Sequence, residues 1–289
     1  MSSALDINIS EENQSRISIK EGVFYDISIT DYHKIDGLSS TQFQDLDLSV
    51  AIYENRHLFK FESEAFNVGN LNHTALLEPH LLHEYIETST KTFDSKETKK
   101  IMELNKDKIV VPCGSIEIAK ERAYKTRLIY DNKIKYISNS LKEVSFIVYD
   151  EDLKLYRKCR ADMWLPQHGV VLDYKTSKEY RPKGFESNSL ESYNYDLSAA
   201  WYIDTINMCI DKFKLPYPKV DQFGWIISPN YIPYKPFGGM AQPDVIEEGR
   251  VKYAKLVEKY IDVNFNGGQD DLFKPMHTKK YYQELKNNK

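Results

Sequence analysis

The segment VVLDYKTS, residues 170–177, places an acidic and a basic side chain two positions apart in an extended stretch. Side chains alternate between the two faces of a strand, so we expect Asp173 and Lys175 on one face and Leu172 and Tyr174 on the other. Taken alone, this pair is also compatible with an ion pair at a solvated sheet edge, which contributes little to stability. The neighbouring acidic residues must decide whether the pair belongs to a functional site or is a solvated ion pair.

A second carboxylate precedes this pair at a spacing that suits a hairpin. Asp162, in RADMW, lies eleven positions before Asp173 (173 − 162 = 11), and two antiparallel strands joined by a short turn can bring these positions side by side. Adjacent carboxylates repel each other unless a cation neutralises them, and hard oxygen ligands suit Mg²⁺ or Mn²⁺. Such a metal activates water and offsets phosphodiester charge, while Lys175 can orient the water or the phosphate. The three residues therefore predict a metal-dependent phosphodiesterase site.

The elements that must position these residues form one central series. Alternating polar and apolar residues predict strands over 143–151, 155–165 and 169–177, with turns at 150–152 and 167–169. The sequence then predicts a helix over 189–211, a strand over 222–228, a loop over 228–243, and a helix from Asp244 to Tyr260 that is capped by Asp244. This order predicts an α/β (α+β) fold with a mixed central β-sheet flanked by helices.

The part of the chain before the series is expected to be mainly helical. Helical periodicity covers 37–57, with Ser39 and Ser40 as N-cap candidates, and recurs over 67–79, 94–112 and 116–130. No internal repeat or low-complexity linker interrupts the chain. We therefore expect a single domain over 1–289, with a helical part (1–135), a catalytic sheet and helix (136–230) and a C-terminal loop and helix (231–289).

The composition is that of an ordinary soluble globular protein, with 41% hydrophobic and 28% charged residues. The formal net charge of −4 argues against a protein that coats nucleic acid by bulk charge, but not against an enzyme with a local basic groove. No apolar run could span a membrane, and the N-terminus lacks a signal-peptide pattern, so a cytoplasmic protein is expected. The three cysteines, Cys113, Cys159 and Cys209, have no spacing typical of a disulfide framework or a zinc site.

These motifs resemble those of a known superfamily. Asp162 followed by VLDYKTS is similar to the D…(D/E)-x-K signature of the PD-(D/E)xK nucleases, with Ala161 in place of the usual proline. More specifically, the chain resembles the nuclease domain of RecE-like exodeoxyribonuclease VIII, a phage-type exonuclease. The matching segments, in family order between residues 32 and 204, are YHKIDGLSSTQFQDL, VGNLNHTALLEP, EVSFIV, KCRADMW, VVLDYKTS and YNYDLSAAWYID. The resemblance implies a restriction-endonuclease-like core and the cytoplasm of a bacterial or phage-infected cell.

The resemblance also implies roles for further residues. His73 matches a histidine beside the metal centre, and Glu143 matches a glutamate that can approach the metal. The alternatives are a histidine satisfied in the core and a solvated glutamate at a strand end. The resemblance thus implies Lys175, Asp173, Asp162 and His73 as catalytic residues, and Asp162, Asp173, His73 and Glu143 as metal ligands.

Two further groups are candidates for contact with DNA. Tyr195 and Tyr202 fit a helix motif of the family, although Ser198 stands where the family has glutamine; both tyrosines could equally be core aromatics. The loop after the strand expected over 169–177 carries three basic residues: Lys178, Arg181 and Lys183. They are placed to meet a DNA backbone, and the alternative is that they are simply solvated.

Residues and resemblance together imply a Mg²⁺-dependent deoxyribonuclease in which Mn²⁺ can substitute. The expected enzyme degrades linear double-stranded DNA from 5′ to 3′ and leaves 3′ single-stranded tails for recombination. An endonuclease or a single-strand exonuclease on the same fold, and a non-catalytic DNA-binding protein derived from it, remain alternatives. The resemblance further implies double-stranded DNA ends, a ring-like homo-oligomer such as a tetramer, and a single-strand annealing protein as partners.

Overall fold

The structure is a computed structural model of the chain, and it describes residues 21–56, 64–90, 95–132 and 135–269. Its strands are β1 (Gly22–Phe24), β2 (Tyr85–Glu87), β3 (Ile109–Val111), β4 (Leu141–Asp150), β5 (Leu155–Leu165), β6 (Val170–Ser177), β7 (Gln222–Pro229) and β8 (Phe237–Met240). Six of them form the central sheet, in the order β1-β4-β5-β6-β7-β8, while β2 and β3 pair separately. Within the central sheet the pairs are antiparallel, except for the parallel pair β6–β7.

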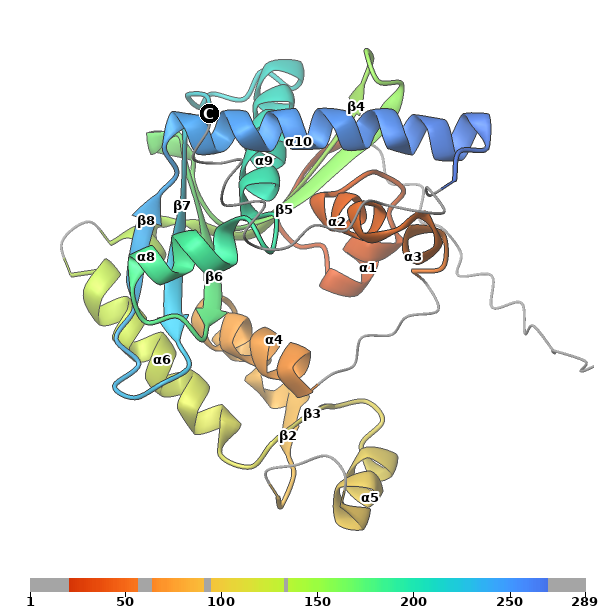
Figure 1. Cartoon of the computed structure of the whole chain (residues 1–289). Helices are drawn as coiled ribbons and strands as arrows, with labels where there is room; N and C mark the ends of the chain where they lie inside the picture. Colours follow the sequence, from red (N-terminus) through yellow and green to blue (C-terminus); the bar gives the residue numbers. More distant parts are fainter. Residues whose placement is uncertain (1–20, 57–63, 91–94, 133–134, 270–289) are drawn as a thin grey trace, which may run out of the picture.

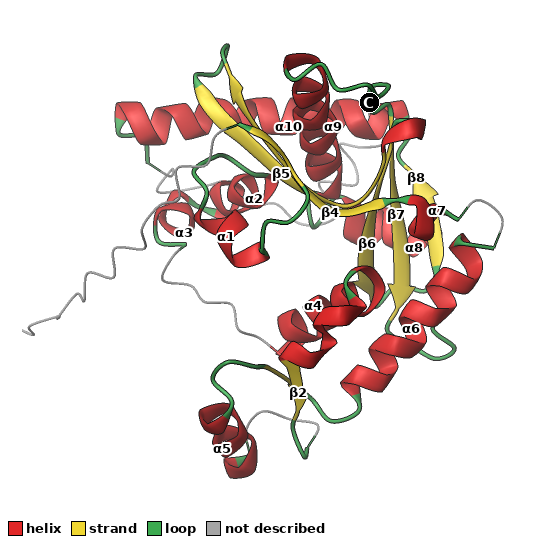
Figure 2. Ribbon diagram, turned by 180° about the vertical axis from the view of Figure 1, so that it is seen from behind, coloured by secondary structure: helices red, strands yellow, loops and turns green. Residues whose placement is uncertain are grey.

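Helices cover both faces of this sheet (Figures 1 and 2). They are α1 (Ile29–Lys34), α2 (Ser40–Leu48), α3 (Val50–Glu54), α4 (Glu64–Leu77), α5 (Lys96–Leu104), α6 (Ser115–Tyr130), α7 (Tyr136–Asn139), α8 (Pro182–Phe185), α9 (Tyr195–Lys212) and α10 (Pro243–Ile261). One hydrophobic core lies between the sheet and α9 and α10, and a second lies between the sheet and α4 and α6. Among the described helices, none has the length and apolar character needed to cross a membrane.

The central series of elements is as the sequence predicts. The strands β4, β5 and β6 follow one another, α9 provides the crossover that a parallel β6–β7 pair requires, and β7 completes the series. The hairpin β4–β5 is the longest pairing, with partners from Leu141↔Trp164 to Asp150↔Leu155. Its apolar positions, such as Val144, Phe146 and Val148, are fully buried. The expected mixed sheet with flanking helices is therefore confirmed.

The N-terminal helices differ from the sequence prediction in two places. The helix expected over 37–57 divides at Ser49, whose backbone is extended and whose hydroxyl accepts a hydrogen bond from the Ile52 N–H, so that it caps α3. Residue 57 lies outside the described residues. The helix expected over 94–112 ends at Leu104, because Ile109–Val111 pairs with β2 as a strand. The β-branched run IVV was the signal for that strand.

The C-terminal elements also differ from the prediction at three points. Helix α9 begins at Tyr195 rather than at residue 189, since Glu186–Leu190 forms a separate π-helical turn. The predicted loop contains β8, in which two glycines obscured the strand pattern. The N-cap of α10 is Gln242 and not Asp244, because Pro243 occupies the first helical turn, where its missing N–H costs nothing.

The contact between α9 and α10 depends on a glycine, which gives a stability prediction. A Cβ at Gly249 would overlap the carbonyl oxygen of Asp196 on α9, whereas a Cβ at Gly69 in α4 would meet no atom within 4 Å. We expect Gly249→Ala to lower the free energy of unfolding by about 1–3 kcal/mol. The matched control Gly69→Ala should raise it by roughly 0.5–1 kcal/mol. Urea unfolding of both variants checks this, and an unchanged midpoint for Gly249→Ala would contradict the close packing.

Candidate active site

Three carboxylates lie at facing positions on three neighbouring strands. The β4–β5 register pairs Lys142 with Met163 and Val144 with Ala161, so Glu143 lies opposite Asp162. The β5–β6 register pairs Met163 with Leu172, and the next facing position brings Asp162 opposite Asp173. The sheet thus sets Glu143, Asp162 and Asp173 in a row across the strands.

The strands β5 and β6 separate at this row. Their pairing covers only Met163↔Leu172, Trp164↔Val171 and Leu165↔Val170. Beyond it, an oxygen of the Asp162 carboxylate accepts a hydrogen bond from the Tyr174 N–H at 2.8 Å, in place of a backbone carbonyl. This contact satisfies a buried donor where the ladder ends, and it fixes the orientation of the carboxylate.

Helix α4 brings His73 to the row. Its Nδ1 lies 3.4 Å from Asp162 Oδ2, and its ring makes an edge contact with Tyr174 at 5.3 Å between centroids. One ligand atom each from His73, Glu143 and Asp162 lies within 4.8 Å of the others. Burial, with the nearby charge of Lys175, lowers the pKa of His73 to about 4. The imidazole is therefore neutral at pH 7, which is the form that binds metals.

Glu143 is held in a strained backbone conformation beside an arginine. Its φ of 53° lies in the left-handed region, which non-glycine residues rarely adopt and which is frequent at functional sites. Its carboxylate accepts a hydrogen bond from Arg160 Nε at 2.6 Å. Burial and the negative charge of Asp162 nevertheless raise the pKa of Glu143. Arg160 was not among the site residues predicted from the sequence, although its place two residues before Asp162 puts both side chains on one face of β5.

Asp173 and Lys175 form a close ion pair on the same face of β6. Their Oδ2 and Nζ atoms are 2.7 Å apart, and both side chains are mostly buried. Burial raises the pKa of Asp173 to about 6, against the opposing effect of Lys175. Burial disfavours the charge on Lys175, but Asp173 and Asp162 outweigh it and raise the pKa of the amine. Lys175 is therefore a fixed positive charge at neutral pH.

The donor set of the row fits a divalent cation. In the protein without metal, burial is the first cause of a raised pKa at each of the three carboxyls, and their mutual repulsion adds to it for Glu143 and Asp173. A bound cation would stabilise their ionised forms. Carboxylate oxygens with one neutral imidazole suit Mg²⁺ or Mn²⁺. Of these groups, His73, Glu143 and Asp162 form the tightest cluster, and Asp173 completes the row beside Lys175.

Comparison with known proteins agrees with this geometry. Residues 39–217, well over half of the chain, match a family described as "PDDEXK-like domain of unknown function (DUF3799)". The chain belongs to this PDDEXK-like family.

Structural comparison gives the same fold. The crystal structure of a "Putative exonuclease" from Eubacterium rectale is similar to this chain with a TM-score of 0.52 and 12% sequence identity. The alignment covers 90% of this chain and 98% of that one. At this identity the likeness shows the fold alone. A comparison with curated proteins gives no match. The PD-(D/E)xK resemblance stated from the sequence is thus confirmed, and membership in the family supports a nuclease.

The two tyrosines of the PDDEXK-like helix motif occupy different surroundings. The Tyr195 ring lies 5.5 Å from Lys175 Nζ and so belongs to the wall of the site. Tyr202 instead packs edge-on against Phe223 in the core between α9 and the sheet. At the position where the resemblance led us to expect glutamine, the Ser198 hydroxyl accepts a hydrogen bond from Gln44 of α2, at 3.4 Å. Contact of this helix with DNA stays a prediction.

The three basic residues proposed from the sequence all lie on the surface after β6. Lys178, Arg181 and Lys183 are exposed, and Arg181 lies over the ring of Tyr180 at 5.0 Å. Lys178 follows the last residue of β6 directly, whereas Lys183 lies within α8. Lys178 therefore lies just beyond the end of the strand that carries Asp173 and Lys175, and the role of all three basic residues stays a prediction.

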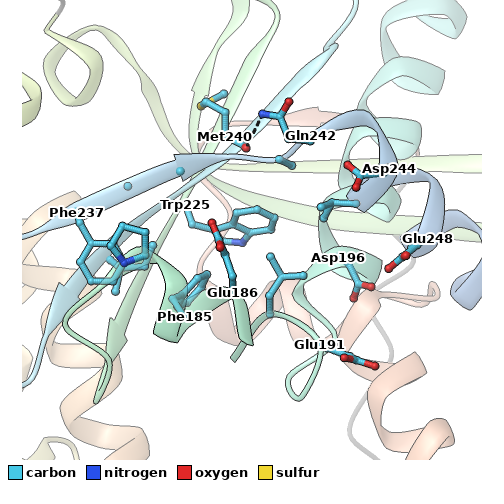
Figure 3. Close-up of a pocket in the computed structure, with 17 residues that line it drawn as sticks. Phe185, Glu186, Glu191, Asp196, Trp225, Phe237, Met240, Gln242, Asp244 and Glu248 are labelled. Carbon is cyan, nitrogen blue, oxygen red and sulfur yellow. Dashed lines mark hydrogen bonds between the residues drawn. The ribbon is translucent and has the colours of Figure 1, made fainter. Parts of the chain in front are cut away.

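A separate cavity of about 530 Å³ lies between α8, β8 and the start of α10 (Figure 3). Its floor contains the Phe185 and Trp225 rings. Its rim carries four carboxylates, Glu186, Glu191, Asp244 and Glu248, and the buried Asp196, which pairs with Lys252, also lines it. No lysine or arginine is among the described residues that line it. Its negative lining would repel a free phosphate.

Proposed function

We propose that this protein is a metal-dependent DNA exonuclease. The observation that carries the proposal is the row Glu143, Asp162 and Asp173, with His73 above it and Lys175 beside it. Membership in the PDDEXK-like family supports a nuclease. The conclusion that the protein hydrolyses phosphodiesters rests on the row of side chains and on the family. The conclusion that its substrate is DNA rests on the resemblance of the sequence segments.

The side chains of the row would divide the work between holding cations and orienting the reactants. Asp162, Glu143 and His73 would hold a divalent cation, and Asp173 would provide a further carboxylate oxygen. When bound, such a cation supplies Lewis-acid stabilisation of the phosphate and a water of lowered pKa. The Tyr174 N–H fixes the Asp162 carboxylate, so that it needs no reorganisation when substrate arrives.

Lys175 would act as a positioned positive charge and not as a general base. Its raised pKa keeps the amine protonated, so that it can donate hydrogen bonds to the attacking water or to a phosphate oxygen. Asp173 orients the amine at 2.7 Å. Arg160 in turn holds Glu143 and partly offsets its charge before a cation binds.

The proposed substrate is linear double-stranded DNA, degraded from 5′ to 3′ with 3′ single-stranded tails as the product for recombination. The RecE-like order of segments supports this choice, and the word exonuclease in the name of the Eubacterium rectale protein agrees with an exonuclease, without reference to substrate or polarity. A ring-like homo-oligomer and a single-strand annealing protein as partner also stay proposals. The mass of the protein in solution, measured by light scattering, tests the first of them.

The test uses a linear duplex with a fluorescent label at one 5′ end and Mg²⁺ or Mn²⁺ in the buffer. We expect labelled mononucleotides to appear first, because hydrolysis begins at the 5′ end. A covalently closed circle should stay intact, and EDTA should abolish cleavage because the carboxylates alone cannot activate water. Thermal unfolding with and without Mg²⁺ gives a second readout, since a ligand that binds only the folded protein raises its melting temperature.

Each alternative predicts a different product. Internal labelled fragments would indicate an endonuclease, and degradation of single strands alone would indicate a single-strand exonuclease. No cleavage of any substrate, combined with binding of the duplex, would indicate a DNA-binding protein without turnover. Any of these results would contradict the proposed polarity or activity.

A further inference from the structure

A second hollow, of about 680 Å³, opens at the ends of β6 and β7. We call it the strand-end groove. Six of the residues that line it matter here: Lys178, Tyr180, Tyr231, Ile232, Lys235 and Phe237. No acidic side chain is among the described residues that line it, in contrast to the cavity of Figure 3. Its charge therefore suits an anionic ligand.

Large apolar side chains project from this groove into solvent. Tyr180 is 62% exposed, Tyr231 55% and Ile232 82%. Exposed apolar groups that gather at one place commonly mark a binding surface. Aromatic rings next to lysines are the combination that binds single-stranded nucleic acid, because bases stack on the rings while the cations neutralise the backbone.

The loop that carries Tyr231 and Ile232 is anchored to α6. Lys125 Nζ donates a hydrogen bond to the carbonyl oxygen of Pro233 at 2.6 Å. The buried ring of Tyr234 lies 4.8 Å from the guanidinium of Arg122. These contacts hold the loop through Pro233 and Tyr234, and they do not involve the side chains of Tyr231 and Ile232. A surface that is already ordered binds a ligand at lower entropic cost.

The groove lies close to the row of carboxylates along β6. Lys175 pairs with Ile227 and Ser177 pairs with Pro229, so the groove begins where these two strands end. Lys178 follows Lys175 by three residues, and about 3.3 Å per residue places it roughly 10 Å away. The groove would therefore meet nucleotides that flank the scissile phosphate.

We propose that the strand-end groove binds a short unpaired stretch of a DNA strand next to the site of cleavage. Its bases would stack on Tyr180 and Tyr231, while Lys178 and Lys235 would neutralise its phosphates. An unpaired strand fits better than a duplex, because base faces are open to an aromatic ring only where they are not stacked inside a helix. This inference rests on the proposed function, which brings a DNA strand to Asp173 and Lys175.

Binding without cleavage tests the groove directly. The wild-type protein, the double variant Tyr180→Ala/Tyr231→Ala and the control Tyr124→Ala are titrated in EDTA into a fluorescent oligothymidine of about ten nucleotides. Tyr124 is a comparably exposed tyrosine on α6 that does not line the groove. We expect the double variant to weaken binding by about tenfold or more and the control to leave it unchanged. Equal affinities for all three proteins would overturn the proposal.

A cross-linking experiment on the wild-type protein avoids any question of folding. An oligonucleotide with 5-iodouracil is irradiated with the protein in EDTA, and the cross-linked peptides are identified by mass spectrometry. We expect cross-links at Tyr180 or Tyr231. Cross-links confined to other surfaces would overturn the proposal.

Cleavage assays separate failure of the groove from failure of the proposed function. With Mg²⁺, the double variant should show a raised KM for duplexes with unpaired ends and an unchanged kcat. Cleavage with the same KM in both proteins would reject the groove alone. Groove-dependent binding of oligothymidine without any cleavage would reject the nuclease function and leave the binding site standing.

Discussion

Replacing Lys175 with alanine should slow cleavage of a linear duplex by at least about a hundredfold. Loss of one preorganised electrostatic partner commonly costs roughly 10²- to 10³-fold in kcat. Lys175 is the charged group held 2.7 Å from Asp173 and beside Tyr195, so no neighbouring side chain of the described site is placed to replace it. Steady-state kinetics with Mg²⁺ should show the loss in kcat more than in KM, because the amine acts on the reacting groups.

The control for this variant is Lys120→Ala. Lys120 pairs with Glu117 at 2.8 Å on the exposed face of α6, so its removal deletes an ion pair of the same type away from the row of carboxylates. We expect that variant to cleave at the wild-type rate. Near wild-type cleavage by Lys175→Ala, in a protein shown to be folded by its thermal transition, would reject the assigned role.

Replacing Asp162 with asparagine should remove both cation binding and cleavage. The substitution keeps an oxygen that can accept the Tyr174 N–H, so the strand geometry should survive while one charge of the row is lost. We expect cleavage to fall by about a hundredfold or more. The rise in melting temperature on adding Mg²⁺ should largely disappear, because the central ligand of the cluster with His73 and Glu143 is weakened.

A stability measurement in EDTA distinguishes this effect from simple damage. Without a cation, Asp162 lies opposite two other carboxylates, so removing its charge relieves repulsion. We therefore expect Asp162→Asn to melt at or above the wild-type temperature in EDTA. The control Asp211→Asn removes an exposed acid that pairs with Lys219, and it should change neither cleavage nor the Mg²⁺ response. A strong Mg²⁺ response in Asp162→Asn would contradict the candidate metal site.

The hairpin that carries Asp162 and Asp173 could be predicted because its signals are local. Alternation fixed the faces of β4, β5 and β6, and short turns left few ways to connect them. The weaker predictions failed where a local signal was ambiguous. Ile109–Val111 followed a helix without a glycine or proline to mark the change, and the glycines of β8 carry no strand preference.

Other parts of the site could not be read from spacing. Arg160 is an ordinary basic residue in the sequence, and only the fold shows that it holds Glu143 at 2.6 Å. The left-handed backbone at Glu143 likewise has no local signature, since neither glycine nor asparagine occupies the position. The strand-end groove combines residues from two loops that are about fifty positions apart, which no local pattern could join.

The sequence by itself determined the series of strands, the face shared by Asp173 and Lys175, and the resemblance that placed the chain among the PD-(D/E)xK proteins. The tertiary structure decided which groups meet: His73 comes from a helix about ninety residues before Asp162, Tyr195 joins from α9, and Arg160 meets Glu143 across the β4–β5 hairpin. The physical reason is that strand periodicity is encoded in adjacent residues. Burial, strain and the pKa of each carboxyl arise from neighbours that are distant in the chain.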